Sequence, residues 1–157
     1  MYIDNNLIKN FTEYVKPLLL DDTEINHEWN IEKDSCTLTF LKNSESGFDI
    51  YIKVYPDRIM VSTDRGAHEH FDVEYENSNL IECTMGFVRD LLSADMRIRE
   101  LLSGNKPYKW IIENFDGEKW NYEGSTGLIF WNYFGRKSEK IYQNDILPRR
   151  MSTQIKE

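Results

Sequence analysis

The segment from residue 68 to residue 74, His-Glu-His-Phe-Asp-Val-Glu, contains the side chains best suited to binding or chemistry. In a β-strand every second side chain points to the same face. One face of this strand would therefore present four potential metal ligands: His68, His70, Asp72 and Glu74. Imidazole and carboxylate groups bind zinc and other divalent ions, but a hydrolytic site usually recruits a third ligand and a carboxylate base from elsewhere. We therefore favour a solvated strand face, next a contact surface for a partner, and last a metal site.

Nucleophilic catalysis needs a cysteine or serine at a sharp turn or helix start, with a histidine within hydrogen-bond reach. Cys36 lies within an apolar alternation, and Cys83 lies early in a predicted helix without a neighbouring base. Two cysteines are too few for a disulfide framework, so we expect small buried thiols in a reducing cytoplasm. The glycine-containing segments 124–127 and 135–138 lack the spacing of a nucleophile elbow or a phosphate loop. The sequence thus predicts no catalytic residues, no bound metal and no cofactor.

Aromatic side chains are concentrated in the second half of the chain. Those between residues 108 and 142 are Tyr108, Trp110, Phe115, Trp120, Tyr122, Phe130, Trp131, Tyr133, Phe134 and Tyr142. One face of a sheet cannot bury all of these rings, so some must face solvent, a groove or a partner. Exposed Trp and Tyr are typical anchors of protein interfaces, which makes Trp110, Trp120 and Trp131 candidate contact residues. Ordinary core packing and a ligand cleft are the alternatives.

The elements that must position these residues follow from apolar periodicity. Apolar residues recur every three or four positions over 3–19 and 79–102, which predicts two amphipathic helices. Alternation at period two predicts strands over 24–31, 36–40, 48–54, 58–63, 69–75, 108–115, 118–122, 128–134 and 139–142. Helices and strands are segregated along the chain, so we predict the α+β class, with a mainly antiparallel sheet and both helices on one face. Residues 1–148 form a single domain in this prediction, and 149–157 form a polar C-terminal tail.

Two glycine positions predict how elements end. Gly104 is expected to end the second helix. The pair Asp116-Gly117 is the signal of a two-residue type I′ hairpin between strands 108–115 and 118–122.

The chain of 157 residues is acidic, with 27 Asp and Glu, 19 Lys and Arg, and a formal net charge of −8. Residues 1–80 carry 7 basic and 16 acidic side chains, net −9, whereas residues 81–157 carry 12 and 11, net +1. An acidic surface repels phosphate backbones, so we expect no nucleic-acid partner. No apolar run approaches the roughly 20 residues that span a bilayer, and the N-terminus lacks the pattern of a signal peptide. We expect a soluble cytoplasmic protein without a membrane partner.

A resemblance to a known class of proteins lies in the second half. The stretch from Trp110 to Trp120, WIIENFDGEKW, is followed by Thr126-Gly127-Leu128 and by Tyr133-Phe134-Gly135. It resembles the C-terminal halves of small bacterial immunity proteins encoded beside polymorphic or contact-dependent toxins. The resemblance implies a toxin domain as the partner, often a basic one, which the immunity protein inhibits by covering it. These families share no catalytic motif, so the resemblance assigns no role to individual residues.

We therefore expect a non-enzymatic protein that binds and neutralises a cognate, basic toxin domain by occlusion. The first candidate contact face consists of Glu69, Asp72 and Glu74, with His68 and His70 beside them. The second consists of the exposed members of the group Trp110, Trp120 and Trp131. Two alternatives stay open: a structural or regulatory module that self-associates, as in a homodimer, and a metal-dependent hydrolase built on the His68/His70 face.

Overall fold

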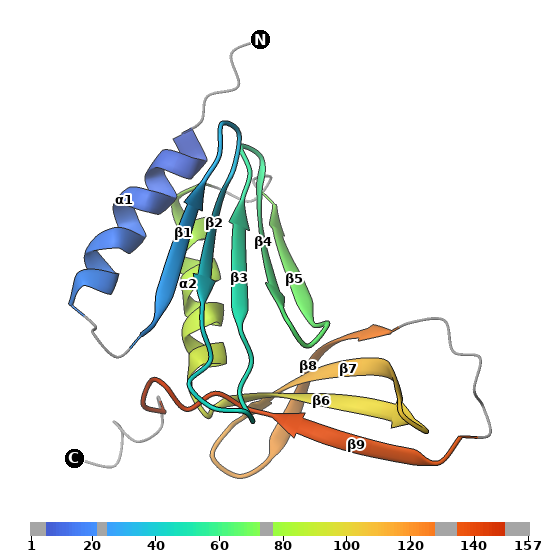
Figure 1. The fold of residues 1–157 in the computed structure, drawn as a ribbon. Coiled ribbons are helices and arrows are strands. Elements are labelled where there is room, and N and C mark those ends of the chain that lie inside the picture. Colours follow the sequence, from blue (N-terminus) through green and yellow to red (C-terminus); the bar gives the residue numbers. More distant parts are fainter. Residues whose placement is uncertain (1–5, 22–24, 73–76, 128–134, 150–157) are drawn as a thin grey trace, which may run out of the picture.

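The computed structural model describes residues 6–21, 25–72, 77–127 and 135–149 (Figure 1). These residues form two helices and nine strands. The strands are divided between a five-stranded and a four-stranded sheet, and neighbouring strands are antiparallel in both. The predicted α+β class with antiparallel strands and two helices is confirmed, and the strands lie in two sheets where the sequence predicts one.

The five-stranded sheet is a meander in chain order. Its strands are β1 (His27–Ile31), β2 (Cys36–Phe40), β3 (Ile50–Val54), β4 (Arg58–Thr63) and β5 (His68–Asp72). Strands β2 and β4 have the bounds that the sequence predicts, and the other three are shorter or shifted by a few residues. Because each strand follows its neighbour through a short connection, β1 and β5 are the two edges of the sheet.

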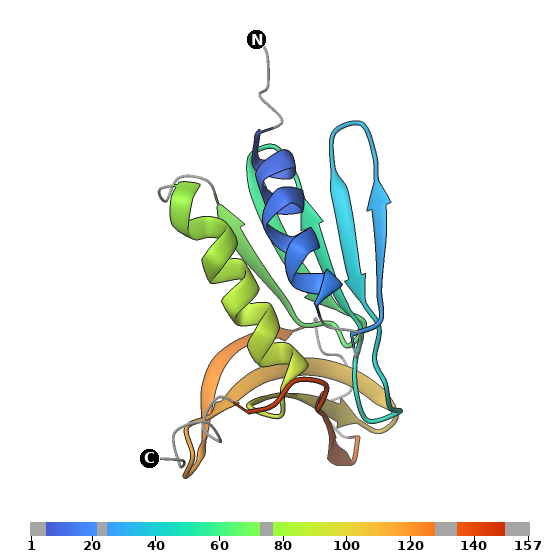
Figure 2. The same cartoon turned by 90° about the vertical axis from the view of Figure 1, so that its left-hand side faces the viewer.

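Helices α1 (Asn6–Leu20) and α2 (Asn77–Leu92) lie side by side on one face of this sheet (Figure 2). The inward side chains of β2 and β3 alternate with half-buried ones, as the period of two requires. The side chains that are buried most completely include Phe11, Val15, Leu38, Phe40, Ile50, Ile52, Val54, Ile59 and Val61. The predicted placement of both helices on one face is therefore confirmed.

The predicted helix over 79–102 is wrong in its second half, because α2 ends at Leu92. Ser93 makes the break. Its backbone N–H and its hydroxyl both donate to the carbonyl oxygen of Asp90, at 3.1 and 2.9 Å, and its Oγ accepts from the Asp95 N–H at 3.2 Å. Such side-chain hydrogen bonds compete with the helical pattern and favour turns.

Strand β6 (Met96–Ser103) occupies the rest of the segment predicted as helix. Met96 and Ile98 are buried, and they alternate with the half-buried Arg97 and Arg99. This period of two is the pattern of a strand. Beyond Leu92, the apolar stripe of the predicted helix contains only Leu102. One apolar residue fits a helical period of 3.6 and a strand period of two equally well.

The four-stranded sheet also contains β7 (Lys106–Phe115), β8 (Trp120–Gly127) and β9 (Lys137–Tyr142), in the order β8-β7-β6-β9. The strand predicted over 128–134 lies outside the described residues. Gly104 does not end a helix: it lies in the turn between β6 and β7, with φ +62°.

The turn between β7 and β8 differs from the type I′ prediction. A type I′ turn needs positive φ at both central residues. Only Gly117 has it, at +101°, and the Asp116 N–H donates to the carbonyl oxygen of Lys119 at 3.1 Å. The central residues are therefore Gly117 and Glu118, one position later than predicted. The Asp116 carboxylate accepts the N–H groups of Glu118 and Lys119, both at 2.9 Å, which closes the turn.

The second sheet lies across one end of the first (Figure 1), and the contacts at this junction include those of Gly66 and of Asn144. Gly66, in the turn between β4 and β5, lies against the ring of Trp110 on β7 so closely that a Cβ there would come within 2.6 Å of it. Asn144, which follows β9 and is buried, accepts the Phe48 N–H at 3.1 Å. It also donates to the carbonyl oxygens of Phe48 and Leu91, at 3.0 and 3.2 Å. One amide thus ties the loop before β3 and the end of α2 to the segment after β9.

Candidate protein-binding surfaces

The first candidate face lies on β5, an edge strand of the five-stranded sheet. His68 and His70 are exposed, and they stand opposite Ser62 and Met60 of β4 on the face that carries no described helix. Their rings form an edge-to-face pair with centroids 5.2 Å apart. The structure therefore places the two histidines together on a solvent-facing strand, as the alternation predicts.

Glu69 is exposed but belongs to the other face of β5, opposite Val61. Alternation along the strand therefore separates this carboxylate from the two histidines. Asp72 is the last residue of β5, and its side chain and the whole of Glu74 lie outside the described residues. Within the described part of the chain, no three His, Cys, Asp or Glu side chains converge where they would hold a metal ion.

His68 also meets the second sheet. Its Nδ1 lies 3.4 Å from the hydroxyl of Thr126 on β8, and Thr126 pairs with Trp110 across β7 and β8. Trp110 is half-buried, and its Nε1–H donates to the carboxylate of Glu100 at 2.8 Å. The junction thus brings together two predicted contact residues, His68 and Trp110, but Trp110 connects the two sheets and is not a free anchor.

The second candidate group divides in the structure. Trp120 lies on the face of the four-stranded sheet that does not carry the buried Met96 and Ile98. This face, here named the outer face, carries Arg97, Arg99, Glu113, Phe115, Trp120, Tyr122, Glu139 and Ile141. The ring of Trp120 packs against Phe115, with centroids 5.2 Å apart, and the guanidinium of Arg97 lies 4.1 Å from its centre. Trp131 lies outside the described residues. Of the three predicted tryptophans, Trp120 is the one that the structure places on a solvent-facing sheet surface, and it is held there by neighbours on both β6 and β7.

A chain of ion pairs runs over the outer face beside Trp120. The Glu113 carboxylate binds Arg97 at 2.8 Å and Arg99 at 3.3 Å, and Arg99 also binds Glu139 at 2.7 Å. The hydrogen bonds that Arg99 donates to the Glu139 carboxylate are the main cause that raises the pKa of Arg99. Glu113 is only 8% exposed, so its two arginines compensate a largely desolvated charge. These contacts fix the arginines in position before any partner binds.

Two exposed apolar side chains flank the ion pairs. Tyr122 on β8 is 66% exposed and Ile141 on β9 is 45% exposed, and both point to the outer face. Trp120 on this surface is among the predicted contact residues, but the arginines beside it are not, because Arg97 and Arg99 fall in the segment that the sequence predicts as helix. The signal was present in the alternation of these arginines with Met96 and Ile98, which predicts a strand with a charged outer side.

Cys36 is buried as predicted, whereas Cys83 is exposed and corrects the prediction of two buried thiols. The buried stripe of α2 runs through Leu80, Thr84 and Val88, which turns the neighbouring Cys83 away from the sheet.

Rigid aromatic rings beside fixed arginines are suited to contact with another protein, since Trp, Tyr and Arg dominate the energy of such interfaces. No helix in the described ranges has the length and apolar character needed to cross a membrane. In comparisons with known proteins, the chain matches no family model, no curated protein and no solved structure.

Proposed function

We propose that this chain is a non-enzymatic, immunity-type protein of the bacterial cytoplasm that binds a cognate toxin domain and neutralises it by occlusion. The observation that carries the proposal is the outer face of the four-stranded sheet. It combines Trp120 and Tyr122 with the pre-positioned Arg97 and Arg99, and no described helix covers it (Figure 1). Side chains that are already ordered lose little conformational entropy on binding, which favours tight association.

The charge distribution supports the same function. Residues 1–80, net −9, build α1 and the whole five-stranded sheet, whereas residues 81–157 are net +1. An acidic layer attracts a basic partner during diffusion, and aromatic anchors then hold it. The exposed β5 edge with His68, Glu69 and His70 lies beside the second sheet, so it is the first part of the five-stranded sheet that we expect a partner on that side to meet.

Co-expression with the toxin tests the proposal. If the proposal is right, a toxin gene lies immediately upstream of the gene for this chain. The wild-type chain should then restore growth to cells that produce this toxin. Tyr122→Ala and Trp120→Ala should each weaken the complex by about 2 kcal/mol, roughly thirtyfold, because they remove anchors from the centre of the contact.

Ile31→Ala is the matched control, since Ile31 is 59% exposed on β1, in the other sheet. Growth that the wild-type chain fails to restore would refute the function. If growth is restored and the toxin binds all three variants with equal affinity, the function stands and only the assignment of the outer face as the contact surface is refuted.

Self-association through the outer face is the second candidate. A twofold interface requires a patch that complements itself. The outer face carries two arginines and two glutamates, so a second copy could match it. Sedimentation of the purified chain tests this second candidate: a dimer that Tyr122→Ala dissociates supports self-association, and a monomer over the micromolar range excludes it.

A further inference from the structure

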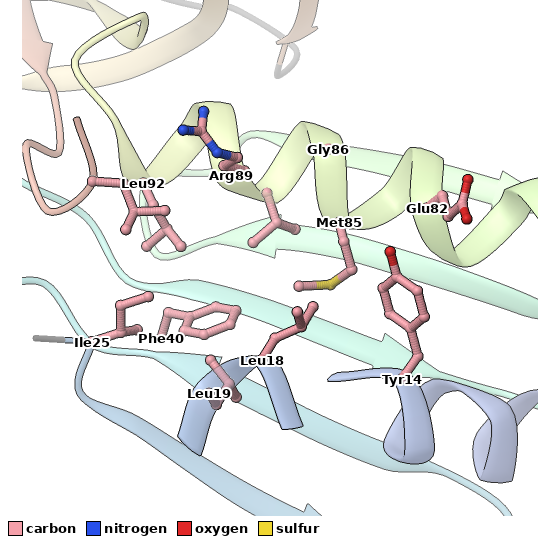
Figure 3. A pocket seen from close by; sticks show the side chains of 12 residues that line it. Tyr14, Leu18, Leu19, Ile25, Phe40, Glu82, Met85, Gly86, Arg89 and Leu92 are labelled. Atoms are coloured by element: carbon pink, nitrogen blue, oxygen red, sulfur yellow. The ribbon is translucent and has the colours of Figure 1, made fainter. Parts of the chain in front are cut away.

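The two faces of the five-stranded sheet differ in their chemistry. One face carries α1 and α2, and the groove between these helices is lined mainly by apolar side chains such as Leu18 and Met85 (Figure 3). Among the described residues, no histidine or cysteine lines that groove. The other face carries no described helix, and there His68 and His70 of the edge strand β5 are exposed. The two imidazoles are therefore accessible to a small ligand.

The separation of the two imidazole rings is suited to one metal ion. Their centroids lie 5.2 Å apart, with an angle of 85° between the ring planes. In a tetrahedral site each coordinating nitrogen lies about 2 Å from the metal, which places the centroids of two neighbouring rings about 5 Å apart. His68 and His70 also share one face of a strand that is held in register by β4. Both rings can therefore bind the same ion without a change of the backbone.

Thr126 of β8 orients the ring of His68. The Thr126 hydroxyl lies 3.4 Å from Nδ1 of His68. When the Nδ1–H donates this hydrogen bond, Nε2 is unprotonated in the neutral ring, and its lone pair can bind a metal. Histidines that bind metals usually donate their other ring N–H in this way. The second sheet thus supplies a supporting contact for a site on the first sheet.

The neighbouring side chains favour copper as the metal. Met60 of β4 is half-buried and stands directly opposite His70, so the two side chains share a face of the sheet. Imidazole binds both zinc and copper, whereas a thioether is a soft ligand that selects copper. Of the divalent first-row ions, Cu²⁺ also binds nitrogen ligands most tightly. The described residues add no third His, Cys, Asp or Glu, so the site is open and unlike a closed structural zinc site.

We propose that His68 and His70 chelate one copper ion on the helix-free face of the five-stranded sheet, with Met60 as an adjacent soft ligand. Alternation along the sequence ranks a metal site last, because it shows neither the spacing of the two rings nor the contact with Thr126. The site assigns no catalysis to the chain, and it does not depend on the proposed toxin contact.

Calorimetric titration of the purified chain with Cu²⁺ and with Zn²⁺ tests the site. The wild-type chain should bind one Cu²⁺, at least about tenfold more tightly than Zn²⁺. The electron paramagnetic resonance spectrum of the complex should show coupling to two imidazole nitrogens. His68→Ala and His70→Ala should each weaken Cu²⁺ binding about tenfold or more and leave one coupled nitrogen, because a single ring cannot chelate.

His27→Ala is the matched control, since His27 is the third histidine of the chain and lies on β1, at the other edge of the same sheet. It should leave the Cu²⁺ affinity and both nitrogen couplings unchanged. Thr126→Val should weaken binding about tenfold but keep both couplings, because it removes only the support of His68. Thermal unfolding of each variant without metal will show that it remains folded.

Met60→Leu tests the soft ligand. It should weaken Cu⁺ binding about fivefold, measured by competition with a chromogenic chelator, and leave Zn²⁺ binding unchanged. An unchanged Cu⁺ affinity would overturn the assignment of Met60. Absence of a single Cu²⁺ site, coupling to fewer than two nitrogens in the wild type, equal effects of His27→Ala and His70→Ala, or Zn²⁺ bound as tightly as Cu²⁺ would overturn the copper site itself.

Discussion

The two thiols of the chain have opposite environments. Cys36 is completely buried on β2, and this burial raises the pKa of its thiol, whereas Cys83 is exposed on α2. Because the thiolate is the reactive form, a water-soluble thiol reagent should modify one cysteine per native chain. Cys83→Ser should leave no fast-reacting thiol, and unfolding in denaturant should expose Cys36. Equal reaction rates of both thiols in the native wild-type chain would contradict this assignment.

Asp116 makes the β7–β8 turn sensitive to acid. Its carboxylate accepts hydrogen bonds from the Asn121 amide and from the N–H groups of Lys119 and Glu118, which lower its pKa to about 2. A pKa that is lower in the folded than in the unfolded chain stabilises the fold above the ordinary Asp value, near pH 4, and this stabilisation is lost as the pH falls through about 2.

An NMR titration of the Asp116 carboxyl group should therefore have its midpoint near 2. The stability difference between the wild type and Asp116→Ala should be constant above about pH 5 and should shrink between about pH 4 and 2. A midpoint at the ordinary value near 4 would show that the turn does not hold the carboxylate.

At the scale of single residues, sequence reasoning found exposed groups better than it found their roles. Alternation places His68 and His70 on a solvent-facing side of β5, and the structure agrees. The role of Trp110 could not be predicted, because its contact with Gly66 joins residues more than forty positions apart in different sheets. Periodicity shows which way a side chain points, but not what the rest of the chain brings against it.

Among the elements, the turn between β4 and β5 is closely constrained by the second sheet. Gly66 has φ +75°, and a Cβ there would lie 2.6 Å from the Trp110 ring. Gly66→Ala should therefore destabilise the protein by about 2 kcal/mol or more, through backbone strain and overpacking.

Gly124→Ala on β8 is the matched control, since no atom lies within 4 Å of the added Cβ and its φ is not positive. Urea unfolding of both variants measures the difference. Equal stabilities would mean that the turn and Trp110 do not pack as described.

The elements were predicted well where one period dominated, as in β2, β3 and β4. The boundary between α2 and β6 was missed because Leu91 and Leu92 end one buried stripe just before Met96 and Ile98 begin another. Side-chain hydrogen bonds of Ser93 decide the break, and apolar periodicity carries no information about them. The division of the strands into two sheets was also beyond local patterns. It depends on which strands pair, and strand pairing is decided by long-range contacts that the apolar period does not encode.

For the whole molecule, the acidity of residues 1–80 should act on association with the toxin. Long-range attraction is screened as the Debye length falls from roughly 10 Å at 0.1 M salt to about 3 Å at 1 M. Stopped-flow mixing should therefore show a lower association rate at high salt and a smaller change in dissociation. Reversing the charges of Glu69, Asp72 and Glu74 should slow association further. Association rates that depend on neither the salt concentration nor the charge reversal would place the interface away from residues 1–80.

The most direct test of the central claim is a titration of the isolated toxin with this chain, read as toxin activity. Occlusion predicts that activity falls in proportion to the chain added and disappears at one chain per toxin. The toxin should regain full activity, chemically unchanged, when the complex is dissociated. Activity that persists in an excess of the chain would contradict the account, as would permanent inactivation of the toxin by substoichiometric amounts, which would reveal an enzyme.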